Sequence, residues 1–211
     1  MTKNRIQILK EKMLSQPRYV SIEQALIITK TYKQHENEPI ILKRAYALAN
    51  ALRELEIGIE NEELIVGNRT KGVRYGVVFP ESGISWVDRE FETISTRKQD
   101  KFLVRDEDIK IFREQIVPYW KGKSLEDVIK QNFGKEISAI NKVVKINQTD
   151  HAQGHICPNV EKWLQKGVSG LLEDAQNHYK NADEDKKNFY QAIIIVMKAV
   201  QNFMLRYHDL L

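Results

Sequence analysis

The chain has 211 residues, of which 42% are hydrophobic and 29% are charged, and apolar residues this frequent exclude a disordered protein. Its single cysteine, Cys157, excludes a disulfide scaffold and fits a reducing, cytoplasmic location. The net charge of +4 is small and dispersed, the first residues lack the apolar run of a secretory signal, and no apolar run is long enough to span a bilayer. Neither nucleic acid nor a membrane is therefore expected as a partner.

The first third of the sequence predicts three helices, because apolar residues recur there at intervals of three and four. The first covers residues 4–14 and stops before Pro17, the second starts at Ser21, and the third covers residues 40–55 after Pro39. On the second helix, the residues expected to face the core are Ala25, Ile28 and Tyr32. On the third, they are Ile41, Ala45, Leu48 and Leu52.

Two short extended segments are expected next. Residues 63–68 form an apolar run that ends at a glycine and an asparagine, which predicts a short buried strand. Residues 72–80 form a second extended segment or a loop, and Pro80 ends it. Ser85 can cap a helix over residues 86–94.

The second half again has helical patterns. The expected ranges are 107–117, which Pro118 would end, 125–132 and 160–179. Ser124 and Asp127 form a capping pair for the second of these helices. The stretch 147–159, which holds Gly154 and Pro158, is expected to be irregular. The predicted fold class at this point is mainly α with a few short β segments.

The last helix starts near Asn181 and is apolar on most of its circumference. Its core stripe comprises Phe189, Ile193, Val196, Val200, Phe203, Tyr207 and Leu210. Leu210 and Leu211 are not followed by a residue that caps a helix. We therefore expect further protein, or another chain, to pack on this helix; the alternative is that the terminal leucines fray.

Few residues indicate chemistry. The sequence contains no nucleotide-binding glycine loop, no nucleophile elbow and no zinc motif. His151 and His155 are four residues apart, but the glycine and proline around them disfavour a helix, so no metal site is expected. Cys157 with His155 as its base would make a small thiol enzyme, although no third orienting group is evident and an inert cysteine is the simpler interpretation.

Five motifs, in this order along the chain, resemble those of one enzyme family. They are Lys43-Arg44-Ala45, Glu63-Leu-Ile-Val-Gly-Asn68, Phe79-Pro80-Glu81, Ile116-Val-Pro-Tyr-Trp-Lys-Gly-Lys123, and Gly154-His155-Ile156 followed by Gly167. Together they resemble the amino-terminal region of glycyl radical enzymes, the pyruvate formate-lyase family, and in particular its dehydratase and lyase branch. The resemblance covers nearly the whole chain.

The resemblance implies a ten-stranded α/β barrel wrapped by helices and the radical chemistry of anaerobic metabolism. In that family, a glycyl radical near the carboxyl end takes hydrogen from a cysteine inside the barrel, and the thiyl radical then takes hydrogen from a small-molecule substrate. An iron–sulfur activating enzyme that uses S-adenosylmethionine installs the glycyl radical. The expected partners are therefore this activating enzyme, the substrate and the rest of the barrel.

The two motifs that carry this chemistry, Gly-Cys-x-Glu and Arg-Val-x-Gly-Tyr, do not occur in the sequence. Cys157 lies in His-Ile-Cys-Pro-Asn and is not expected to be the thiyl cysteine. Residues 1–211 are thus expected to form a partial domain, the amino-terminal portion of such an enzyme, with no catalytic, metal or cofactor-binding residue of their own. The resemblance makes His155 a candidate substrate contact. The alternative is a non-catalytic helical protein-interaction module.

Overall fold

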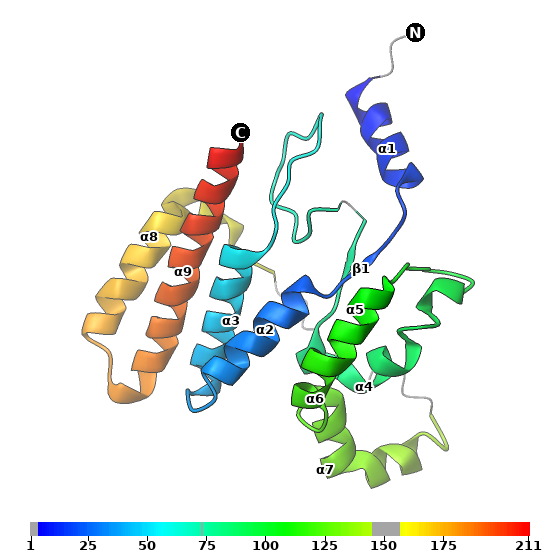
Figure 1. Ribbon diagram of the computed structural model, residues 1–211. Helices are drawn as coiled ribbons and strands as arrows, with labels where there is room; N and C mark the ends of the chain where they lie inside the picture. The colour runs from blue at the N-terminus through cyan, green and yellow to red at the C-terminus, as the bar shows by residue number, and fades with distance from the viewer. Residues whose placement is uncertain (1–3, 73, 145–156) are drawn as a thin grey trace. The chain divides into compact units, whose positions relative to one another are not determined.

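The computed structural model describes residues 4–72, 74–144 and 157–211, and most of them are helical (Figure 1). The chain divides into two compact units. The first comprises Met1–Gln16, Lys30–Arg74 and Cys157–Leu211, and the second comprises Pro17–Thr29 and Tyr75–Ile156. Helix α2 (Glu23–Gln34) belongs in part to each. Among the described residues, no helix is both long and apolar enough to cross a membrane.

Three helices form the body of the first unit: α3 (Ile40–Glu54), α8 (Val160–Lys180) and α9 (Glu184–Leu210). Helix α9 packs against both α3 and α8 (Figure 1). Its alanines allow close packing, and Ala192 lies in one core cluster with Leu42 and Ala45 of α3. The expectation that α9 is a long core helix is therefore confirmed.

Burial along α9 differs from the predicted stripe, of which only Tyr207 is among the buried residues of this helix. Tyr207 is buried as expected, but Phe189 and Leu210 are 51% and 49% exposed. The buried positions also include Ile194 and the small Ala199, which lie outside the predicted stripe. Two neighbouring helices thus cover the middle of α9, and large apolar side chains stay exposed towards its ends.

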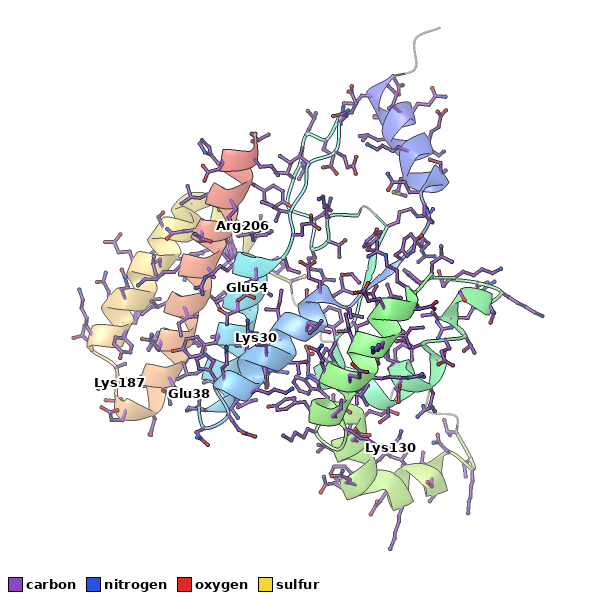
Figure 2. All side chains as sticks on the ribbon, viewed as in Figure 1. Lys30, Glu38, Glu54, Lys130, Lys187 and Arg206 are labelled. Carbon is purple, nitrogen blue, oxygen red and sulfur yellow. The ribbon has the colours of Figure 1, made fainter. Side chains whose placement is uncertain are left out.

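The buried face of α3 is built largely from alanines. Its buried residues are Leu42, Ala45, Ala47, Ala49 and Ala51. The prediction was right for Ala45 and wrong for Leu48, which is 45% exposed. The prediction assumed that large apolar side chains mark the buried face, whereas α9 packs on the alanine-rich surface. Arg206 of α9 then closes the end of α3 by donating to the carbonyl oxygens of Leu52 at 2.7 Å and Leu55 at 2.6 Å (Figure 2).

Helix α1 (Arg5–Ser15) confirms the first predicted helix, and Asn4 caps it by accepting from the Gln7 N–H at 2.9 Å. It contacts the loop 56–68, where the Arg5 guanidinium donates to the carbonyl oxygen of Glu62 at 3.0 Å, and it contacts Arg74, which donates to the carbonyl oxygen of Leu14 at 3.2 Å. None of its residues is fully buried. This helix is therefore held by polar contacts rather than by a core.

The buried strand predicted over residues 63–68 is wrong. Leu64 and Ile65 are 75% and 90% exposed, and the structure assigns no strand there. The backbone turns sharply on both sides, with positive φ angles of 74° at Glu62 and 120° at Gly67. Within the described residues no strand pairs with this segment, so its apolar side chains have no sheet to cover.

The second unit begins with two very short parallel strands, β1 (Val20–Ser21) and β2 (Gly76–Val77). Val20 pairs with Gly76, and an isolated parallel bridge joins Tyr19 to Leu103. The extended segment expected within residues 72–80 is confirmed at β2. The remaining elements of this unit are α4 (Pro80–Glu90), η1 (Ile94–Thr96), α5 (Asp106–Ile111), η2 (Phe112–Ile116), α6 (Val117–Trp120) and α7 (Leu125–Ile140).

Several boundaries in the second unit differ from the predictions. Pro118 does not end a helix, because α5 continues through the π-helical turn η2 into α6, whose first turn holds Pro118 and needs no N–H from it. Helix α4 begins at Pro80, so Ser85 is not its cap, and α7 runs on to Ile140. The Ser124 and Asp127 capping pair is confirmed: the Ser124 hydroxyl accepts from the Asp127 N–H at 3.3 Å.

The core of the second unit is aromatic. Phe91 and Phe112 are fully buried and their ring centroids lie 4.5 Å apart. Trp120 is also buried, and its indole N–H donates to the buried hydroxyl of Thr29 at 2.8 Å. The residues predicted on α2 are confirmed, since Ala25, Ile28 and Tyr32 are all buried.

Helix α8 confirms the predicted range 160–179 almost to the residue, but it contains a break. Gly167 has φ 60° and ψ −176°, a conformation that side chains disfavour. The two halves of α8 are therefore two helical segments joined at this glycine.

Candidate functional site

The residues that the sequence singled out for chemistry are not brought together within the described structure. His155, the candidate substrate contact, and His151 lie outside the described residues. Cys157 is described as an exposed free thiol. Within residues 4–72, 74–144 and 157–211, no group of three His, Cys, Asp or Glu side chains could hold a metal ion.

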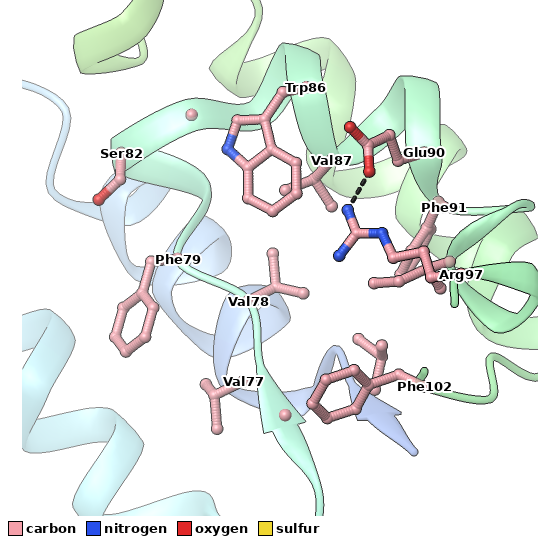
Figure 3. Close-up of a pocket in the computed structure, with 14 residues that line it drawn as sticks. Val77, Val78, Phe79, Ser82, Trp86, Val87, Glu90, Phe91, Arg97 and Phe102 are labelled. Carbon is pink, nitrogen blue, oxygen red and sulfur yellow. Dashed lines mark hydrogen bonds and ion pairs between the residues drawn. The ribbon is translucent and has the colours of Figure 1, made fainter. Parts of the chain in front are cut away.

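The second unit contains a cavity of about 410 Å³ (Figure 3). It lies beside the two short strands, α4, η1 and the chain that follows η1. Most of its walls are aliphatic or aromatic. The lining residues are Val20, Gly76, Val77, Val78, Phe79, Ser82, Gly83, Trp86, Val87, Glu90, Phe91, Ile94, Arg97 and Phe102.

Gly76 in β2 lets an aromatic side chain cover the strand. A Cβ atom at Gly76 would lie 2.8 Å from Cε1 of Phe102, which is closer than two carbons can approach. The guanidinium of Arg18 also lies over the ring of Phe102, 4.1 Å from the ring centroid. Phe102 therefore forms a fixed wall of the cavity.

Gly83 shapes a second wall. Its φ of −161° and ψ of 76° interrupt α4 three residues after the helix begins. A Cβ atom there would lie 2.8 Å from the indole of Trp86, so the missing side chain allows Trp86 to lie against the backbone. Figure 3 shows Trp86, Val78 and Phe102 around the cavity. The interruption in α4 thus shapes the apolar lining.

The charged groups of the cavity pair with each other. Arg97 and Glu90 form an ion pair at one side of it (Figure 3). Among the lining residues that the structure describes there is no cysteine, histidine or lysine. The two charges neutralise each other and the walls are apolar. The cavity is therefore better suited to binding apolar side chains than to acid–base catalysis on a polar substrate.

A buried carboxylate lies behind α4. The Glu126 side chain is buried; one oxygen pairs with Lys130, and the other, Oε2, has no hydrogen-bond partner in the described structure. This Oε2 atom lies 3.3 Å from the position that a Cβ of Gly83 would take. Sequence reasoning missed Glu126, because an acidic residue in the first turn of a capped helix normally lies in solvent.

Comparisons with known proteins identify the family. The model of the family described as "Pyruvate formate lyase-like" matches residues 1–211, and the chain belongs to this family. It is 27% identical to (2S)-3-sulfopropanediol dehydratase of Klebsiella oxytoca, over 98% of this chain and 26% of that protein. It is 31% identical to a probable dehydratase of Escherichia coli, over 89% of this chain and 24% of that protein.

Solved structures agree with the sequence comparison. The glycerol-bound B12-independent glycerol dehydratase from Clostridium butyricum has a TM-score of 0.90 and 29% identity, over 99% of this chain and 28% of that chain. The chain therefore spans about a quarter of the length of the relatives that it matches, and corresponds to an amino-terminal portion of glycyl radical enzymes. The predicted family and the fold class, a mainly helical portion of an α/β barrel enzyme, are confirmed.

Proposed function

We propose that this chain supplies the amino-terminal, non-catalytic portion of a glycyl radical dehydratase or lyase and needs the remainder of such an enzyme for radical chemistry. The observation that carries the proposal is the match along the whole chain to only about a quarter of each relative. The absence of Gly-Cys-x-Glu and Arg-Val-x-Gly-Tyr from the 211 residues supports it.

The described residues do not fit the parts that carry the radical. Gly76 follows Arg74 and Tyr75, but it is paired in β2 and covered by Phe102. Cys157 lacks the flanking glycine and glutamate of the thiyl motif. We therefore assign no catalytic step to this chain, and we assign the radical glycine and the thiyl cysteine to the remainder of the enzyme.

The apolar surface on both units is consistent with further protein packing on them. On the second unit, the cavity beside β2 would receive apolar side chains from the remainder of the barrel. On the first unit, exposed large apolar residues include Leu64, Ile65, Leu164, Phe189 and Leu205. Apolar surface of this kind is costly to leave in water and is typical of surfaces that other protein covers.

The remaining parts of the proposal concern the complete enzyme. Its substrate would be a small hydroxylated molecule, and His155 of the Gly-His motif would hydrogen-bond a substrate hydroxyl. An iron–sulfur activating enzyme that uses S-adenosylmethionine would install the radical. We place the enzyme in the cytoplasm, where an exposed thiol such as Cys157 stays reduced.

The coding DNA after the codon for residue 211 tests the proposal. A continuation, in the same frame or a shifted one, that encodes Gly-Cys-x-Glu and Arg-Val-x-Gly-Tyr would support the assignment to a glycyl radical enzyme. Unrelated sequence at that place, with no separate gene for the remainder nearby, would contradict it and favour a helical protein-interaction module.

A further inference from the structure

A second cavity lies on the first unit, between α3, α9 and the residue that follows α2. Its volume is about 530 Å³. We call it the α3–α9 cleft. Its lining residues are His35, Tyr46, Ala49, Asn50, Arg53, Ile195, Lys198, Ala199 and Asn202. In contrast to the cavity of the second unit, more than half of these residues carry polar groups.

The charged side chains that line this cleft are all positive. Arg53 and Lys198 contribute two cations, and the described lining includes no carboxylate. Within residues 4–72, 74–144 and 157–211, neither of these cations forms an ion pair, although many other lysines and arginines do, for example Lys166 with Asp174. Two uncompensated cations at the walls of one cleft attract an anion into it.

A chain of hydrogen bonds orients the arginine. The buried hydroxyl of Thr31 accepts from Nδ2 of Asn50 at 3.0 Å, which fixes the direction of the Asn50 amide. Oδ1 of Asn50 then accepts from Nη1 of Arg53 at 3.1 Å. This contact uses one N–H of a guanidinium that has five, so the others remain available to an anion.

The opposite end of the cleft is also ordered. The imidazole of His35 stacks on the ring of Tyr46, with 4.1 Å between centroids and an interplanar angle of 10°. Stacking holds the ring, so a nitrogen can donate to a ligand without a further loss of side-chain freedom. The amides of Asn50 and Asn202 add uncharged donors.

We infer that the α3–α9 cleft binds a small oxyanion with a phosphate- or sulfonate-like head. Guanidinium groups bind such heads through two parallel N–H donors, and a lysine adds a point charge. The volume also leaves room for a short organic group beside the head. This inference does not rest on the proposed function, because it uses only the contacts within the first unit.

The test is a titration of the ¹⁵N-labelled chain with inorganic phosphate at pH 7.5 and constant ionic strength, followed by NMR. We expect saturable shifts at Asn50, Arg53 and Asn202, with a Kd on the order of millimolar, since the site is open to water and screened by salt. Methanesulfonate and acetate, titrated separately, distinguish a tetrahedral head from a simple carboxylate.

Two variants and one control complete the test. Arg53→Gln and Lys198→Gln should each weaken phosphate binding by about fivefold, as expected for the loss of a partly exposed charged donor. Arg44→Gln, on the same helix but outside the cleft, should leave the Kd unchanged. Both target residues are exposed, so circular dichroism should show an unaltered fold. Non-saturable shifts, shifts equal to those with sodium chloride, or equal weakening by Arg44→Gln would overturn the inference.

Discussion

The indole N–H of Trp120 donates to the hydroxyl of Thr29 at 2.8 Å, and both groups are buried although they lie 91 residues apart in the sequence. Thr29 in turn donates to the carbonyl oxygen of Ala25 at 2.6 Å. The bond therefore ties α6 to the first half of α2 inside the second unit.

Thr29→Val should destabilise the chain, because valine keeps the shape of threonine but removes the buried hydroxyl that accepts from the indole N–H. The expected loss in the free energy of unfolding is about 1–3 kcal/mol, measured by urea denaturation. Thr93→Val is the control, since the Thr93 hydroxyl is exposed. Trp120→Phe combined with Thr29→Val should cost less than the two single changes added together, and strict additivity would contradict a direct bond.

Gly83 and Gly134 should respond oppositely to alanine. At Gly83 the new methyl group would lie 2.8 Å from Trp86, so Gly83→Ala should destabilise by about 1–3 kcal/mol and change the Trp86 fluorescence. At Gly134, within α7, a methyl group would meet no atom within 4 Å. Gly134→Ala should therefore stabilise by about 0.5–1 kcal/mol, since alanine favours a helix. Equal effects at the two sites would refute the packing of Trp86 on Gly83.

The Asp127 carboxylate predicts a pH dependence. Partial burial raises its pKa, but hydrogen bonds from the Gly122 N–H and from the hydroxyls of Ser124 and Ser85 outweigh burial and hold the pKa below its ordinary value. The ionised form is thus favoured in the folded state. Its contribution to stability is complete above the unfolded pKa of about 4 and is lost as pH falls through the lower folded pKa.

Asp127→Asn should therefore lower the free energy of unfolding by about 1 kcal/mol at pH 7, as expected for a damaged helix cap, and by progressively less as pH falls below about 4. Urea denaturation at pH 7, 5, 4 and 3 measures this. Glu136→Gln, at an exposed position on the same helix, should show no such trend. A difference in the free energy of unfolding between the unchanged chain and Asp127→Asn that stays constant from pH 7 to pH 3 would show that the carboxylate charge is not responsible.

The contacts of Arg206 predict that lysine at this position cannot fully replace arginine in stabilising the chain. It donates to two carbonyl oxygens at the end of α3, those of Leu52 and Leu55. Its positive charge is also attracted to the partial negative charge at this carboxyl end of the helix. Arg206→Met should cost about 1–3 kcal/mol in the free energy of unfolding. Arg206→Lys should restore only part of this, because an ammonium group cannot reproduce the planar fork. Arg44→Met serves as the control, and full restoration by lysine would contradict the role of the fork.

The sequence predicted what local chemistry determines. The Ser124 and Asp127 capping pair, the buried residues of α2 and the range of α8 all follow from side-chain type and spacing, and all are confirmed. Motif order also identified the family, which the comparisons confirm.

Tertiary contacts decided the remaining features. Leu48 resembles a core residue, but α9 packs on the alanines of α3 instead. Pro118 resembles a helix end, but the π-helical turn before it supplies a new helix start. The cavity beside β2 and the hydrogen bond from Asn50 of α3 to Thr31 of α2 had no sequence signal, because each depends on which segments meet in space. His155 lies outside the described residues, so its substrate contact stays a prediction.

The central claim is that these 211 residues belong to a glycyl radical enzyme but cannot carry the radical themselves. The most direct measurement is an electron paramagnetic resonance spectrum of the chain after anaerobic incubation with S-adenosylmethionine, a reductant and the activating enzyme of a glycyl radical dehydratase. A full-length relative activated in parallel, such as the glycerol dehydratase of Clostridium butyricum with its own activating enzyme, shows that the reagents work. We expect the glycyl radical doublet from the relative and none from this chain. A doublet from residues 1–211, coupled to turnover of a substrate, would contradict the account.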